Sequence, residues 1–155
     1  MIEKFIDSVL IIDDSKSEVE ELVRFFTEND VRVNHYTPEE LDIKNGIFKN
    51  RKLIIVDLFL VDSENLSNNI SRIRKYFKNF IGKEFGNYGV VLWTKHLENL
   101  IEFRDKIKLD QNLYNLPIFI IGLDKTKYLT AGNYNDVIID LENEIQKSLE
   151  FNFDF

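Results

Sequence analysis

The sequence predicts an α/β fold in which helices cover both faces of a parallel sheet, and two observations support this prediction. First, four short apolar runs are rich in β-branched residues, as is typical of strands buried on both faces. They lie at 9–12, 53–56, 90–93 and 118–121. Second, segments with helical periodicity separate the runs, and strands that alternate with helices form parallel sheets. The 155 residues, 44% of them hydrophobic, suffice for one such domain.

The remaining elements follow in chain order. A weaker run at 31–36 alternates apolar and polar residues, which suits an edge strand. Apolar residues at spacings of three and four predict helices. These are expected at 16–29, 64–81, 96–111 and 135–150. Thr37-Pro38-Glu39-Glu40 is a capping box that opens a further short helix. Five strand–helix units in succession predict a flavodoxin-like doubly wound fold with strand order 2-1-3-4-5.

Composition and charge exclude several classes of function. The net charge is −7, whereas a nucleic-acid surface needs clustered Lys and Arg, so we expect no nucleic-acid contact by this domain. No apolar run approaches the ~18 residues of a membrane span, and the N-terminal apolar stretch carries two acids, unlike a signal peptide. We therefore expect a cytoplasmic protein without membrane contact. The absence of cysteine excludes disulfides, thiol catalysis and zinc–thiolate sites.

Polar residues stand where the predicted strands end, at the edge where doubly wound sheets bind ligands. The first strand ends in Asp13-Asp14, the third in Asp57 and the fourth in Thr94-Lys95. Carboxylates at one edge repel one another unless a cation lies between them, and Mg²⁺ is held by carboxylates, waters and phosphate oxygens. Either acid of the first pair, taken alone, would be explained by capping of the next helix. Together with Asp57, the pair predicts a metal site.

The order of these motifs resembles a known family. Three segments are similar to the receiver domain of two-component response regulators. They are Val9-Leu10-Ile11-Ile12-Asp13-Asp14-Ser15, Leu53-Ile54-Ile55-Val56-Asp57-Leu58 and Val91-Leu92-Trp93-Thr94. The separation between Asp14 and Asp57 is that expected for a helix, a strand and a second helix in that family. The resemblance covers residues 7–150, nearly the whole chain.

The resemblance implies a role for each motif. Asp57 would accept a phosphoryl group from a histidine kinase or a phosphotransfer protein. Thr94 would hydrogen-bond one phosphoryl oxygen, and Lys125, after the fifth strand, would neutralise another. The implied Mg²⁺ ligands are Asp13, Asp14, Asp57 and the backbone carbonyl of Phe59. Such a domain is a phosphoacceptor and not an enzyme, with at most self-phosphorylation and self-dephosphorylation activity. Its chemistry needs positioning and charge neutralisation but no general base.

Several residues depart from the family's pattern. Where family members carry a proline, four residues after the acceptor, this chain has Val61. The residue after the threonine is normally small but is Lys95 here, and Gly122 replaces the aromatic residue expected before the lysine. The lysine is normally followed by proline, and Lys125 is not. Lys95 and Lys127 therefore remain rivals for its role.

Two alternative functions stay open. A degenerate pseudo-receiver would have the same fold and would bind proteins independently of phosphorylation. A phosphatase of the haloacid-dehalogenase type also uses an aspartate at a strand end, but it needs a second aspartate two positions later, where Phe59 stands. Glycine-based nucleotide binding is excluded, because no Gly-x-Gly-x-x-Gly or Walker loop follows the first strand.

The receiver-like domain is expected to span residues 1–150. Residues 151–155 then form a C-terminal tail or the start of a linker to an output domain, which is either attached or separate. This segment carries aromatic residues at Phe151, Phe153 and Phe155. Exposed apolar groups of this kind normally find a partner, so they predict docking on the domain, association into a homodimer, or attachment to a further domain.

Overall fold

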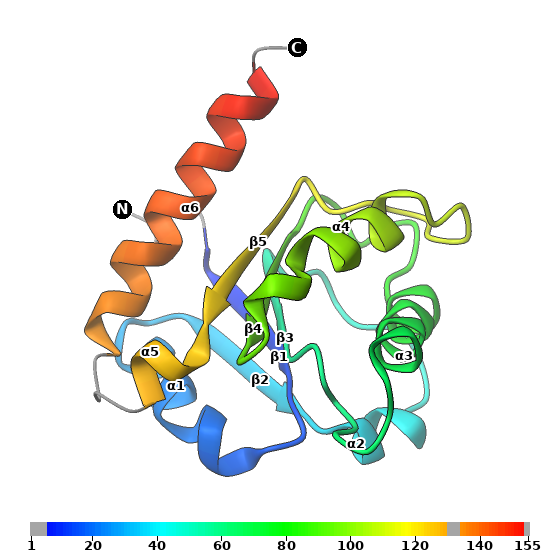
Figure 1. The fold of residues 1–155 in the computed structure, drawn as a ribbon, viewed down its shortest axis with the longest axis horizontal. Helices are drawn as coiled ribbons and strands as arrows, with labels where there is room; N and C mark the ends of the chain where they lie inside the picture. The colour runs from blue at the N-terminus through cyan, green and yellow to red at the C-terminus, as the bar shows by residue number, and fades with distance from the viewer. Residues whose placement is uncertain (1–5, 130–133, 154–155) are drawn as a thin grey trace.

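A five-stranded parallel sheet forms the centre of the protein (Figure 1). The structure is a computed structural model and describes residues 6–129 and 134–153. The strands are β1 (Ser8–Ile12), β2 (Arg32–Tyr36), β3 (Leu53–Val56), β4 (Gly89–Thr94) and β5 (Phe119–Asp124). Their spatial order is β2-β1-β3-β4-β5. The predicted flavodoxin-like fold is therefore confirmed, including its strand order.

Helices cover both faces of this sheet. The helical elements are α1 (Lys16–Glu28), α2 (Pro38–Asp42), α3 (Leu66–Phe80), the 3₁₀ turn η2 (Leu97–Asn99), α4 (Leu100–Lys108), α5 (Lys125–Leu129) and α6 (Asn135–Phe153). Apolar side chains of α1, α5 and α6 form one core against the sheet, and those of α2, α3 and α4 form the other. In the described part of the chain, no helix is long and apolar enough to cross a membrane.

Both cores are built from the same strands, because successive residues of a strand point to opposite faces. In β1, Leu10 and Ile12 face the core under α2, α3 and α4, whereas Val9 and Ile11 face the core under α1 and α6. All five residues of β1 are buried. The continuous apolar runs in the sequence thus reflect a sheet that is covered twice. β2 lies at the edge, and its residues are exposed or half-buried.

Local side-chain contacts set the helix starts. Thr37 and Glu40 form the predicted capping box of α2. α3 begins at Leu66 and not at residue 64, because the Asn65 side chain accepts the N–H of Asn68 at 2.8 Å. Asparagine is among the strongest N-cap residues, which explains this start.

Three further differences from the sequence predictions concern the second half of the chain. The single helix expected over 96–111 divides into η2 and α4. No sequence pattern predicts α5, because five residues are too few to show a helical period. The Asp124 carboxylate accepts the N–H of Thr126 at 3.0 Å and thereby begins α5. α6 continues to Phe153, so residues 151–153 are helical, while residues 154–155 of the expected tail lie outside the described residues.

The connections that precede β4 (residues 81–88) and β5 (residues 109–118) lie at the amino ends of these strands. They pack on each other: the Tyr88 hydroxyl donates to the Asn115 carbonyl at 2.8 Å, and the Asn115 side-chain amide donates to the Gly82 carbonyl at 2.9 Å. These contacts therefore stabilise the amino ends of β4 and β5 and leave the carboxyl ends of the strands open.

Candidate functional site

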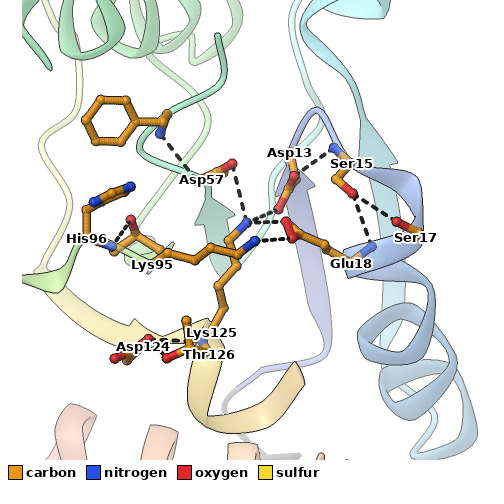
Figure 2. A network of polar contacts seen from close by, with 12 residues as sticks. Asp13, Ser15, Ser17, Glu18, Asp57, Lys95, His96, Asp124, Lys125 and Thr126 are labelled. Carbon is orange, nitrogen blue, oxygen red and sulfur yellow. Dashed lines mark hydrogen bonds and ion pairs between the residues drawn. The ribbon is translucent and has the colours of Figure 1, made fainter. Parts of the chain in front are cut away.

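The carboxyl ends of the strands bring the predicted acidic residues together, and Figure 2 shows two of them, Asp13 and Asp57. Asp13 and Asp14 follow β1 and Asp57 follows β3, and one oxygen from each carboxylate lies within 4.8 Å of the others. The backbone N–H of Asp57 donates to the Ile12 carbonyl at 2.9 Å, which joins the two strand ends. A cavity of about 390 Å³ opens beside the cluster. The arrangement therefore offers several carboxylate oxygens to one ligand.

Burial makes the ionised forms of these carboxyl groups costly. Asp13 is completely buried and Asp57 is 6% exposed, whereas Asp14 reaches solvent. Burial raises the pKa of Asp13 from 3.8 to about 6, although the charge of Lys125 opposes the shift. Burial likewise raises the pKa of Asp57 to about 7, again against the pull of Lys125. Both carboxyls would be stabilised in their ionised form by additional positive charge.

Lys125 is the lysine that reaches the carboxylates. Its ammonium nitrogen lies 3.1 Å from Asp13 Oδ2, 3.0 Å from Glu18 Oε1 and 3.4 Å from Asp57 Oδ2. Burial lowers the pKa of Lys125, but the charges of Asp57 and Asp13 outweigh burial and raise it above its ordinary value. Its rival Lys127 pairs with Asp140 at 2.7 Å instead. The buried ammonium therefore belongs to Lys125.

Glu18 pairs with both lysines of the cavity, and no sequence pattern predicts either pair. Its Oε1 lies 3.0 Å from Lys125 Nζ, and its Oε2 lies 3.0 Å from Lys95 Nζ. The Ser15 hydroxyl, which caps α1, accepts the backbone N–H of Glu18 and so fixes its turn of the helix. Lys125 follows Glu18 by 107 residues. Only the fold brings them together, and no local sequence pattern signals the pair.

Phe59 and Thr94 lie at the borders of the site. The N–H of Phe59 donates to Asp57 Oδ1 at 3.3 Å, and the Phe59 ring packs on that of His96 with centroids 4.7 Å apart. Thr94 is buried at the end of β4, where its hydroxyl accepts the N–H of His96 at 2.9 Å. Among the described residues, Phe59 and His96 line the cavity and Thr94 does not.

The connection from β3 to α3 lacks the proline of the resembled family, and Asn69 holds it instead. Asn69 is completely buried in α3. Its side-chain oxygen accepts the N–H of Val61 at 2.9 Å, and its nitrogen donates to the Val61 carbonyl at 3.0 Å. Further bonds run from the same nitrogen to the carbonyls of Glu64 and Asn65. The loop that follows Asp57 is therefore fixed by one buried amide.

Gly122 stands where the resembled family carries an aromatic side chain, and the side chains of Leu97 and Leu100 occupy the space beside it. A Cβ atom added to Gly122 would lie 2.4 Å from Leu97 Cδ1 and 3.1 Å from Leu100 Cδ2. The start of the helical segment after β4 thus closes directly over β5. Any rearrangement at this site must proceed without an aromatic residue at position 122.

Comparisons with known proteins show only distant similarity. No family model matches the chain, and no curated protein matches it. A response regulator from Burkholderia pseudomallei, with a phosphorylated aspartic acid, calcium ion and citrate, is similar at 13% identity and TM-score 0.48, over 90% of this chain and 74% of that chain. An adenylate cyclase from Rhodopirellula baltica is similar at 16% identity and TM-score 0.45, over 92% and 98%. A fusion that contains a yeast Spc42 coiled coil is similar at 15% and 0.45, over 96% and 92%. Scores this low carry no inference about function.

Proposed function

We propose that this domain is a receiver that accepts a phosphoryl group on Asp57 with the help of a divalent cation. The supporting observation is the convergence of Asp13, Asp14 and Asp57 within 4.8 Å at the strand ends, beside the ammonium group of Lys125. Such a set suits phosphoryl transfer, in which catalysis consists of positioning and of neutralising charge.

Asp57 is the proposed nucleophile. One of its carboxylate oxygens would bond to phosphorus as the bond between phosphorus and the donor's leaving group breaks, which leaves an acyl phosphate on the chain. The hydroxyl of Thr94, which accepts the N–H of His96 and lies behind the cavity lining, would donate its own proton to a phosphoryl oxygen. Lys125, 3.4 Å from Asp57, would neutralise another of these oxygens.

Carboxylate oxygens are the ligands that Mg²⁺ prefers, and Asp13, Asp14 and Asp57 would hold it. The Phe59 backbone carbonyl completes the proposed ligand set. Bound there, the cation would neutralise charge on the transferred phosphoryl group. Because Asp14 is exposed, it leaves that side of the cluster open to water and to the phosphodonor. Added positive charge also lowers the pKa of Asp57 and keeps the nucleophile ionised near neutral pH.

A receiver of this kind acts between two partner proteins. A histidine kinase or a phosphotransfer protein would supply the phosphoryl group, and an attached or separate output domain would respond to it. The domain itself would not be an enzyme beyond gaining and losing its own phosphoryl group. A cytoplasmic location belongs to the same proposal.

One observation favours a second candidate function, a binding module that works without phosphorylation. Both lysines of the cavity, Lys95 and Lys125, are already paired with Glu18. Because Glu18 already balances the charge of these lysines, no phosphoryl group is needed to keep their side chains in place.

Intact-mass measurement after incubation with Mg²⁺ and acetyl phosphate separates these functions. We expect the mass of one added phosphoryl group, and no added mass when a chelator removes the cation. The variant Asp62→Asn is a matched control, because Asp62 is an exposed acid that lines the same cavity. It should be phosphorylated as the natural chain is. Absence of any added mass would favour the binding module, and continuous release of phosphate from a model ester would indicate a phosphatase.

A further inference from the structure

The Lys125 ammonium donates hydrogen bonds to Asp13 and Glu18 and forms a longer ion pair with Asp57 (Figure 2). Glu18 lies at 3.0 Å and Asp13 at 3.1 Å, while the proposed acceptor Asp57 lies farther away, at 3.4 Å. A phosphoryl group on Asp57 that draws the ammonium closer than 3.4 Å would therefore compete with Asp13 and Glu18, which hold its two hydrogen bonds.

Glu18 is the partner that can leave at the lowest cost. Asp13 is completely buried, and its other oxygen accepts the N–H of Ser15 at 2.8 Å, so it is held from two sides. The Glu18 side chain is 22% exposed and lines the cavity, and its second oxygen is already paired with Lys95. Lys95 is half exposed and also lines the cavity. A displaced Glu18 carboxylate thus keeps a cationic partner and regains water.

We propose that Glu18 is an internal competitor of the phosphoryl group for Lys125, and that phosphorylation of Asp57 displaces it. Glu18 is then a positioning residue: it holds Lys125 over the acceptor at rest and sets how readily the site accepts an anion. The inference rests on the proposed function and adds to it the residue that opposes phosphorylation.

The variant Glu18→Gln tests this competition. Its neutral amide has the same shape but binds an ammonium group less strongly than a carboxylate does. We expect the initial rate of phosphorylation by acetyl phosphate, with Mg²⁺, to rise about tenfold, the equivalent of one charge-assisted hydrogen bond. A merely structural role for Glu18 predicts the opposite, because a less ordered Lys125 would slow the reaction.

Glu20→Gln is the matched control. Glu20 is an exposed acid on the same helix, so this variant changes the net charge equally without touching Lys125. Its rate should stay close to that of the natural chain. A faster Glu18→Gln variant supports the inference, even if the natural chain takes up no phosphate. Equal rates for a phosphorylated natural chain and Glu18→Gln overturn the inference alone. If neither chain gains a phosphoryl group, the proposed function fails and this inference fails with it.

Discussion

Replacing Asp57 with asparagine is expected to abolish phosphorylation and at the same time to stabilise the protein above pH 7. The loss follows because the amide cannot form the acyl phosphate. The stabilisation follows because burial raises the pKa of Asp57 to about 7, so its ionised form is costly in the folded chain. A variant that loses activity through general damage would lose stability as well.

The raised pKa of Asp57 makes the stability of the natural chain depend on pH. Between the ordinary pKa of 3.8 and the folded value of about 7, the folded chain retains a proton that the unfolded chain has released. The contribution of Asp57 to the free energy of unfolding therefore falls as pH rises through this window, by on the order of 4 kcal/mol. Denaturant unfolding should show that the free energy of unfolding of Asp57→Asn, relative to that of the natural chain, is higher at pH 8 than at pH 5. An advantage that shrinks between pH 5 and pH 8 would contradict the account.

Replacing Lys125 with glutamine is expected to destabilise the protein by about 3 kcal/mol or more at pH 8, because it leaves buried carboxylates without their ammonium partner. The loss should be smaller at pH 5, where Asp13 and Asp57, with pKa values of about 6 and 7, are mostly protonated. Phosphorylation should slow by about 10²-fold, since a charge that stabilises the transferred group is gone. Thermal unfolding at both pH values and intact-mass kinetics give these quantities.

Lys127→Gln is the control for Lys125→Gln. Lys127 lies two residues farther along, is half exposed, and forms its ion pair with Asp140 outside the cavity. Such a solvent-exposed pair contributes little to the free energy of unfolding. Similar losses of stability and of rate in the two variants would assign no special role to Lys125.

Much of the fold is readable in the sequence, because the signals that specify it are local. The runs at 53–56 and 90–93 fall within β3 and β4, and a five-fold strand–helix alternation leaves few arrangements of the sheet. Asp13, Asp14 and Asp57 are found for the same reason: each follows a strand, and parallel strands end at one edge.

Other parts of the site depend on contacts that no local pattern contains. In the sequence, Glu18 has the pattern of an ordinary acid on a helix surface. In the structure, β5 and α5 place Lys125 next to it. The resemblance assigns this role to Lys125, but the sequence does not exclude Lys95 or Lys127, because all three stand near strand ends. Asn69 resembles a polar residue within a helix, yet it is buried and holds the loop after Asp57. These roles arise from packing between elements distant along the chain.

Cation binding tests the central claim most directly. Mn²⁺ takes the same oxygen ligands as Mg²⁺, and the electron paramagnetic resonance signal of free Mn²⁺ reports how much remains unbound. We predict one bound ion per natural chain, and an affinity at least about tenfold weaker in Asp14→Asn. Asp14 is exposed, so its replacement should leave the fold intact, and Asp62→Asn should bind as the natural chain does. If Mn²⁺ does not bind, or binds equally well to Asp14→Asn, the three carboxylates do not form a metal site and the account is wrong.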